Sequence, residues 1–99
     1  MEREGKWYLY ILRCRDGTLY TGITTDVEKR FAAHCAGKGA KYTRGRGPLA
    51  LCYSEACGNH SHALKREREI KALTRVEKEH MIAAAKKNCQ ILANEYNTR

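Results

Sequence analysis

The sequence has no long hydrophobic run, and this absence excludes several classes of protein. The first apolar segment, Trp7 to Leu12, is too short for the core of a signal peptide or for a membrane span. The 99 residues suffice for one domain but not for a separate targeting or regulatory module, and they contain no internal repeat. We therefore expect a single cytoplasmic domain over residues 1–99, with its core at about 7–85 and a frayed tail at about 88–99.

Cysteine pairs with the spacing of a redox or zinc motif are also missing. The five cysteines are an odd number without CxxC spacing, so we expect reduced thiols and no disulfide framework. One alternative is a zinc site, but the C-x4-C-x2-H-x-H spacing of its candidate ligands is not that of a zinc finger. Those ligands would be Cys52, Cys57, His60 and His62; the other cysteines are Cys14, Cys35 and Cys89.

Acidic residues are scarce relative to basic ones. Nineteen Lys and Arg against eleven Asp and Glu give a formal net charge of +8, spread along the chain rather than confined to a tail. A folded domain this basic favours a polyanionic partner, namely DNA or RNA. The alternative is that the basic surface only aids solubility.

The remaining pattern predicts an α+β domain. Trp7 to Cys14 and Thr18 to Thr24 are typical of strands and are joined by the turn signal Asp16-Gly17. Further on, the pattern predicts a helix, a basic loop, a strand and two helices, at about 26–36, 37–48, 49–55, 61–73 and 74–85. The order β-β-α-β-α-α indicates a small three-stranded sheet flanked by helices.

The hairpin turn decides which way two tyrosines face. A two-residue loop at 16–17 would put Tyr10 and Tyr20 on opposite faces of the sheet. A three-residue loop at 15–17 pairs Tyr10 with Gly22 and puts both tyrosines on one face, with room for the Tyr10 ring beside the glycine. We predict the three-residue loop. The alternative for the two tyrosines is simple packing within strands.

Two polar residues of the first helix border its apolar positions. Arg30 and His34 are four residues apart and so share one face, beside a predicted buried stripe of Val27, Phe31 and Cys35. A guanidinium there can grip a phosphate oxygen, and a histidine can bind phosphate or relay a proton. The alternative is a solvated pair that flanks the core.

Glu67 falls on the apolar stripe of the second helix, between Ala63 and Ile70. A carboxylate there needs a partner, because an unpaired buried charge is costly. Two partners remain open, a nearby Arg or Lys and a metal ion. A hard oxygen ligand with open water positions suits Mg2+ or Mn2+.

Taken together, these residues resemble the GIY-YIG nuclease superfamily. The resemblance rests on Tyr8-Leu9-Tyr10, a nine-residue gap, Tyr20-Thr21-Gly22, Arg30, His34 and Glu67. It covers about residues 7 to 85 and looks closest to the small stand-alone members. It implies the β-β-α-β-α-α fold, one divalent metal ion (Mg2+ or Mn2+) and hydrolysis of DNA phosphodiester bonds.

The resemblance also implies roles for five residues. Glu67 would hold the metal ion, Tyr20 would be the general base, and Tyr10 would help to position the attacking water or the phosphate. Arg30 would stabilise the charge growing on the phosphate, with His34 assisting beside it. Because a free tyrosine has a pKa of about 10, Tyr20 would need nearby positive charge. The alternative is that Tyr20 only orients the water.

The glycine-rich loop supplies candidate contacts to nucleic acid. Lys38, Lys41, Arg44 and Arg46 would contact phosphates, and Tyr42 would offer a platform for base stacking. Such contacts read sequence poorly, so we expect structure-selective or nonspecific binding. The alternative is a flexible basic loop without such a role.

Two other functions stay open. Ile23 follows Gly22 at a position where several active family members carry a lysine. One catalytic cation is therefore missing, or Lys41 or Arg46 replaces it. This favours a nucleic-acid-binding module of the same fold with little or no catalytic activity. A scaffold protein is the third hypothesis, with an apolar helix face for a partner. That face would consist of Val76, Met81, Ile82 and Ala85.

Overall fold

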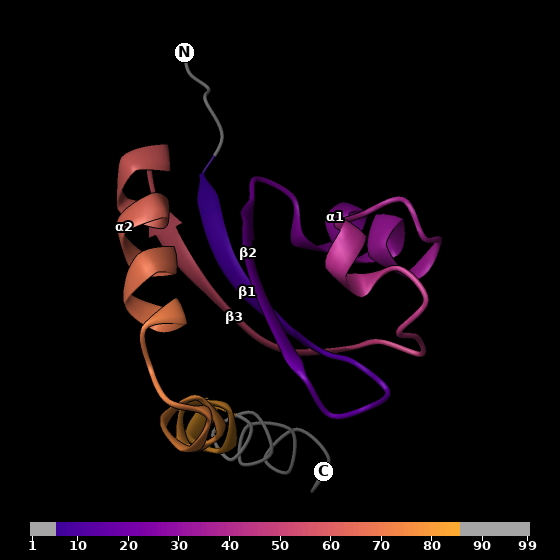
Figure 1. Ribbon diagram of the computed structural model, residues 1–99. Coiled ribbons are helices and arrows are strands. Elements are labelled where there is room, and N and C mark those ends of the chain that lie inside the picture. Colours follow the sequence, from indigo (N-terminus) through magenta and orange to yellow (C-terminus); the bar gives the residue numbers. More distant parts are fainter. Residues whose placement is uncertain (1–5, 86–99) are drawn as a thin grey trace, which may run out of the picture.

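The computed structural model describes residues 6–85 and confirms the predicted α+β class and element order (Figure 1). Strands β1 (Trp7–Arg13), β2 (Leu19–Thr24) and β3 (Ala50–Gly58) form an antiparallel sheet in the order β2-β1-β3. Helix α1 (Val27–Cys35) follows β2, and helix α2 (His60–Lys71) follows β3. A third helix occupies residues 75–85. The predicted tail at 88–99, with Cys89, lies outside the described residues.

The β1–β2 hairpin has the predicted three-residue turn, with Gly17 at a φ of 89°. Tyr10 pairs with Gly22 and Leu12 pairs with Tyr20, as the prediction required. Because side chains alternate between the two faces of a strand, Tyr10 and Tyr20 lie on the same face. The turn chemistry alone therefore determined the relative orientation of the two tyrosines.

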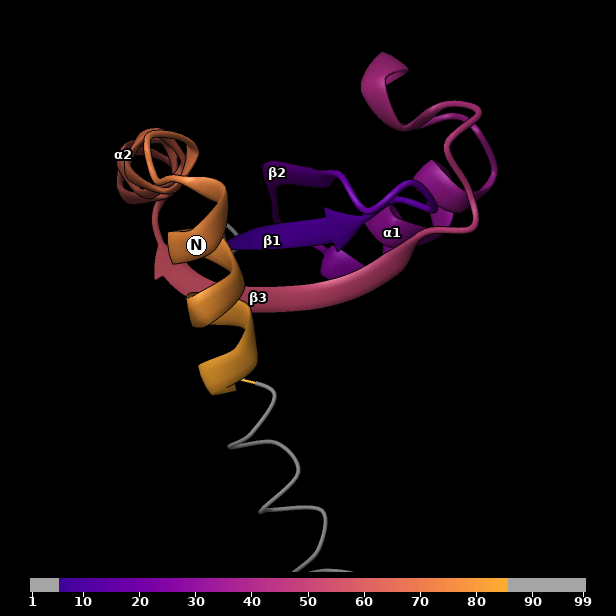
Figure 2. The ribbon, with the colours of Figure 1, turned by 60° about the horizontal axis from the view of Figure 1, so that its bottom comes forward.

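The sheet separates two layers of the molecule (Figure 1). On one face, Leu9 and Ile11 of β1 pack with Ile70 of α2 and Ile82 of the third helix. Burying each such side chain contributes roughly 1.5–3 kcal/mol. Figure 2 shows α2 and the third helix at the same end of the sheet, away from α1. Tyr10 faces away from the aliphatic core, on the side of α1.

Side-chain caps are found at the starts of α1 and the third helix, close to the predicted starts at 26 and 74. The Asp26 carboxylate accepts a hydrogen bond from the Lys29 N–H at 3.0 Å at the start of α1. Thr74 and Glu77 form the reciprocal capping box of the third helix, with bonds of 2.9 and 3.1 Å. By contrast, β3 extends past its predicted end at residue 55 to Gly58, because these added residues pair with the start of β1.

The predicted buried stripe of α1 is wrong. Val27 and Phe31 are only partly buried and Cys35 is exposed, whereas His34 is 2% exposed. A histidine can take this buried place because both of its ring nitrogens have hydrogen-bond partners. The helix therefore meets the sheet through a polar side chain rather than an apolar one.

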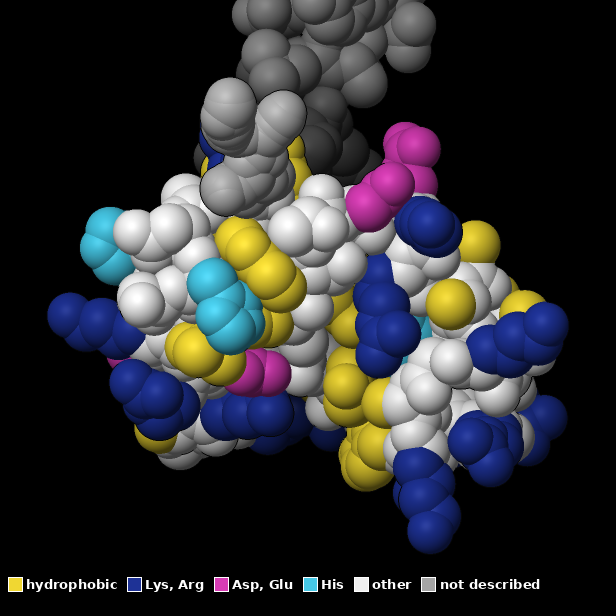
Figure 3. Space-filling model, turned by 90° about the horizontal axis from the view of Figure 1, so that it is seen from above, with side chains coloured by type: hydrophobic (Ala, Val, Ile, Leu, Met, Phe, Trp, Pro, Cys, Tyr) yellow, Lys and Arg dark blue, Asp and Glu magenta, His cyan; other side chains and the backbone are white. Residues whose placement is uncertain are grey.

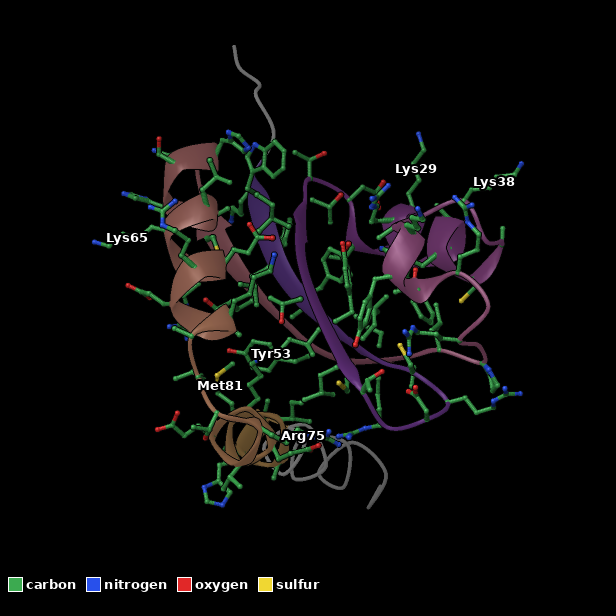
Figure 4. All side chains as sticks on the ribbon, in the orientation of Figure 1. Lys29, Lys38, Tyr53, Lys65, Arg75 and Met81 are labelled. Carbon is green, nitrogen blue, oxygen red and sulfur yellow. The ribbon has the colours of Figure 1, made fainter. Side chains whose placement is uncertain are left out.

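The third helix uses its apolar residues inside the protein. Ile82 is buried in the core and Met81 packs against it; Figure 4 shows Met81 and Tyr53 between this helix and the sheet. Val76 is exposed. Met81 and Ile82 of the apolar face proposed for a scaffold partner are therefore used inside the protein. Within residues 6–85, no helix is both long enough and apolar enough to cross a membrane.

An ion-pair cluster ties the third helix to the hairpin. Arg13 of β1 donates two hydrogen bonds of 2.8 Å to the Glu79 carboxylate. Arg75 donates to the same carboxylate at 2.9 Å and to the Gly17 carbonyl at 2.7 Å, and Figure 4 shows its side chain reaching from the third helix. Hydrogen bonds from Arg13 and Arg75 lower the pKa of Glu79 to about 2.

We expect Glu79→Gln to lower the melting temperature by a few degrees at pH 7. The folded-state pKa lies below the ordinary value of 4.5, so the contribution of this carboxylate is fully present above that pH and is lost as the pH falls towards 2. The difference in melting temperature between wild type and variant should therefore become smaller between pH 4.5 and 2. Thermal unfolding followed by circular dichroism measures this difference, and a difference independent of pH would contradict a role for the charge.

Candidate active site

Tyr10 lies at the centre of the sheet face beneath α1. Its side chain is 1% exposed, and its hydroxyl lies 2.9 Å from Nε2 of His34. On the neighbouring strand, a Cβ at Gly22 would lie 2.6 Å from the tyrosine hydroxyl oxygen. The glycine therefore makes room for the Tyr10 ring, as the hairpin register predicted.

His34 is held through its second ring nitrogen as well. Nδ1 lies 2.8 Å from the Thr43 hydroxyl and accepts a longer bond, of 3.4 Å, from the Ala40 N–H. The Thr43 hydroxyl also donates a hydrogen bond of 3.0 Å to the Ala40 carbonyl, so the segment after α1 holds the imidazole in place. Burial, and then the charge of Arg30, lowers the pKa of His34, so the imidazole is neutral at pH 7.

The segment after α1 packs directly against the His34 ring at Gly39. A Cβ at this position would lie 2.6 and 2.7 Å from two ring carbons, although the backbone does not require a positive φ there. We expect Gly39→Ala to destabilise the fold by about 1–3 kcal/mol, because the rigid ring must move away from Tyr10. Urea unfolding measures the loss; unchanged stability would contradict this packing.

Tyr20 and Arg30 complete the surroundings of Tyr10 and are both partly exposed. The Tyr20 ring centroid is 6.4 Å from that of Tyr10 and 5.3 Å from that of His34. Burial raises the pKa of Tyr10; Arg30 opposes this through a hydrogen bond and its charge, whereas Tyr20 and Glu67 add to the rise. Tyr10 thus contacts Tyr20 and His34, and the charges of Arg30 and Glu67 act on its pKa.

Glu67 lies on α2, which packs against the sheet. Its side chain is 20% exposed, and one carboxylate oxygen lies 3.2 Å from the Lys71 ammonium. Lysine is therefore the partner that the carboxylate has in this structure. The Lys71 side chain is 55% exposed, so its ammonium can move into solvent when another cation approaches the carboxylate. The charge of Glu67 contributes to the raised pKa of Tyr10.

Among residues 6–85, no group of three or more His, Cys, Asp or Glu side chains could hold a metal ion. The zinc alternative is thus wrong for this structure. A metal at Glu67 would have one protein carboxylate, with its other ligands from water and phosphate, which is a common arrangement for Mg2+. The donor present therefore fits Mg2+ or Mn2+ bound together with a substrate.

Comparison with known proteins decides the family. A model of the GIY-YIG catalytic domain matches residues 6–80, more than half of the sequence. The chain belongs to the GIY-YIG family. A UPF0213 protein of Cronobacter sakazakii is 54% identical over 78 residues, which cover 79% of this chain and 82% of the relative. YhbQ of Escherichia coli, also a UPF0213 protein, is 47% identical over 88 residues, or 89% and 88% of the two chains.

Two solution NMR structures share the fold of this GIY-YIG domain. The UPF0213 protein BH0048 from Bacillus halodurans is 48% identical, with a TM-score of 0.53 over 80% of this chain and 84% of that chain. The protein EF2693 from E. faecalis is 35% identical, with a TM-score of 0.56 over 86% and 92%. The names of these four proteins state no activity.

The basic loop of this GIY-YIG domain is more ordered than its sequence suggests. It contains a 3₁₀ turn, η1 (Lys41–Thr43), although the sequence of the loop has neither helical nor strand periodicity. Arg46 forms an ion pair of 2.9 Å with Asp16 in the hairpin turn. The Tyr42 ring stacks on Tyr20, with centroids 5.7 Å apart. Three of the predicted phosphate contacts are exposed, namely Lys38, Lys41 and Arg44.

Further basic side chains surround the candidate site. Figure 3 shows lysine and arginine side chains on both halves of one face, with few acidic ones between them. Lys29 and Lys38 point away from the protein beside α1, and Lys65 points away from α2 on the other side (Figure 4). Sequence analysis did not single out Lys29 and Lys65, because exposed lysines on helices give no signal beyond ordinary solvation.

Sequence analysis also missed Thr43, which is 2% exposed and bonds His34. No local signal identifies it, since it lies in a loop without periodicity. Its neighbour Tyr42, by contrast, was noted as an aromatic residue among basic ones.

Proposed function

We propose that this protein is a divalent-metal-dependent endonuclease that hydrolyses DNA phosphodiester bonds. The observation that carries the proposal is the cluster of Tyr10, Tyr20 and His34, whose ring centroids lie 5.3, 5.8 and 6.4 Å apart. His34 bonds the Tyr10 hydroxyl, and Arg30 opposes the rise in the pKa of Tyr10. Membership of the GIY-YIG family implies a nuclease-like fold, and this cluster supports the chemistry.

The two partly exposed residues would act directly on the substrate. The Arg30 guanidinium would bind a non-bridging phosphate oxygen and stabilise the charge that grows there. Tyr20, reacting as the phenolate, would accept a proton from the water whose oxygen forms the new bond to phosphorus, while the bond to one ester oxygen breaks. That leaving oxygen takes up a proton from solvent.

Tyr10 and His34 would act through their neighbours rather than by touching the substrate. Both are almost completely buried and bonded to each other. The hydrogen bonds at both ring nitrogens of His34 hold the imidazole, and through it the Tyr10 hydroxyl, in one orientation. The pair would thus fix the polar surface on which Tyr20 and Arg30 work.

Glu67 would hold the metal ion, with Mg2+ or Mn2+ as the candidates. The metal would supply positive charge to the phosphate and lower the pKa of a bound water. The protein's own contribution is a partly buried carboxylate on α2 that is paired with Lys71 of the same helix.

The partner would be DNA, with RNA as an alternative polyanion, bound mainly through phosphates. Lys38, Lys41 and Arg44 would contribute charge from the loop, and Lys29 and Lys65 would extend the contact on either side. Such binding should weaken steeply with salt and depend little on sequence.

Cutting assays test the proposal. Purified protein is incubated with labelled duplex, branched and single-stranded DNA and with RNA, in the presence of Mg2+, Mn2+ or EDTA. We expect cutting of at least one substrate that requires metal and stops in EDTA. Binding without cutting under every condition would overturn the proposal.

A nucleic-acid-binding module with little or no activity is the second candidate. Ile23 stands on β2 directly after Gly22, and Glu67 has a lysine partner in this structure. This function predicts binding that does not depend on metal and is insensitive to Glu67→Gln.

A further inference from the structure

Two neighbouring residues of η1 contact two different residues of the candidate site. Tyr42 stacks on Tyr20 with an interplanar angle of 24° and a centroid distance of 5.7 Å. Thr43, the next residue, lies 2.8 Å from Nδ1 of His34. One short turn of the loop therefore holds both Tyr20 and His34, whose ring centroids are 5.3 Å apart.

The position of Tyr42 is itself fixed from the hairpin. The Arg46 guanidinium carbon lies 4.6 Å from the centre of the Tyr42 ring, and its Nη1 lies 2.9 Å from the Asp16 carboxylate. The Arg46 carbonyl also accepts a hydrogen bond of 2.9 Å from the Arg15 N–H. We call the series Asp16, Arg46, Tyr42 and Tyr20 the hairpin stack. It begins in the hairpin turn and returns to β2 of the same hairpin.

The hairpin stack limits the conformations that the Tyr20 side chain can adopt. This side chain is only partly buried, and its ring is bordered by the rings of Tyr10, His34 and Tyr42. Of these three, Tyr42 is the exposed one, at 42%. Without it, a side of the Tyr20 ring would face water, and the side chain could adopt other rotamers.

We propose that Tyr42 is a positioning residue, which holds the Tyr20 hydroxyl in place for phosphodiester hydrolysis. This inference rests on the proposed nuclease function and replaces the sequence-based interpretation of Tyr42 as a platform for a base. The ring of Tyr42 already contacts Tyr20 and the Arg46 guanidinium. A base that stacked there would have to compete with these contacts.

The two roles differ in what they do to binding and to turnover. A positioning residue changes the rate at saturating substrate, because a displaced reacting group lowers the rate without removing contacts to the nucleic acid. A stacking platform contributes to affinity, and its loss weakens binding. Measuring the dissociation constant and the single-turnover rate separately therefore distinguishes them.

The variants are Tyr42→Ala, Tyr42→Phe and Asp16→Asn. For Tyr42→Ala we expect the saturating single-turnover rate to fall about tenfold or more, with the dissociation constant in EDTA changed less than about threefold. Tyr42→Phe keeps the ring and should restore the rate. Asp16→Asn keeps an acceptor for Thr18 but weakens the hold on Arg46, so cutting should slow while binding is unchanged or tighter.

Weaker binding by Tyr42→Ala with an unchanged rate at saturation would overturn the inference in favour of a platform. A Tyr42→Phe variant as impaired as Tyr42→Ala would also overturn it. If wild type cuts no substrate, the proposed function fails, and NMR of 13C-labelled tyrosines then decides the positioning role alone. Tyr42→Ala should shift the Tyr20 ring signals and weaken their contacts to His34, and unchanged signals would overturn the inference.

Discussion

Replacing Glu67 by glutamine is expected to reduce metal-dependent cutting about a thousandfold or more. The amide keeps the size of the side chain but removes the only carboxylate proposed to bind the metal, whose effect on the transition state is worth several kcal/mol. Binding of DNA in EDTA should remain within about threefold of wild type, because phosphates are held mainly by lysines and arginines. Single-turnover assays and fluorescence anisotropy measure the two quantities.

Glu69→Gln is the matched control for this variant. Glu69 lies on the same helix, is exposed, and pairs at 3.2 Å with Arg66, which also bonds Glu55 of β3. It should cut DNA at the wild-type rate. If Glu67→Gln cuts as fast as wild type, or if both variants lose activity equally, Glu67 does not have the assigned role.

Tyr20→Phe is expected to slow cutting by about 10²–10⁴-fold, the range for loss of a general acid or base. The change removes only a hydroxyl, so the ring can keep its contacts with Tyr42 and His34. Tyr53→Phe serves as control, because the Tyr53 hydroxyl bonds Glu55 and its side chain packs on the other face of the sheet. The rate at saturating DNA and metal is the measurement.

A Tyr20→Phe protein that cuts within about twofold of wild type would contradict a role for this hydroxyl in proton transfer. The metal would then activate the water, and Tyr20 would contribute shape alone. Equal losses in Tyr20→Phe and Tyr53→Phe would instead indicate a general effect on folding, which thermal unfolding of both variants would reveal.

The relation of Tyr10 to Tyr20 was predictable because local chemistry determines it. A glycine in the left-handed conformation closes a three-residue turn, and the strand register follows from that turn. The helix starts at Asp26 and Thr74 were predictable for the same reason, since capping depends on residues three or four positions apart.

The burial of His34 was not predictable from α1 alone. Periodicity pointed to Val27, Phe31 and Cys35, because it assigns the buried face to apolar residues. His34 is buried instead because its partners come from elsewhere in the chain: Tyr10 is 24 residues away and Thr43 is nine residues away. No helical pattern contains that information.

The basic loop shows a similar limit. Its glycines and positive charges predicted an irregular surface segment, and Lys38, Lys41 and Arg44 are indeed exposed. Its attachment through Arg46 to Asp16, 30 residues away, depends on the tertiary fold. The environment of Glu67 was predictable only in part. Its place on an apolar stripe indicated a carboxylate that needs a partner, but the sequence left open whether that partner is a lysine or a metal.

Broadening of NMR signals by Mn2+ tests most directly whether one metal-dependent site unites these residues. The labelled protein is titrated with Mn2+ while a DNA oligonucleotide is bound, for wild type and for Glu67→Gln. The account predicts that signals of Tyr10, Tyr20, Arg30 and His34 broaden together in wild type and remain sharp in the variant. Broadening centred elsewhere, or equal broadening in both proteins, would contradict it.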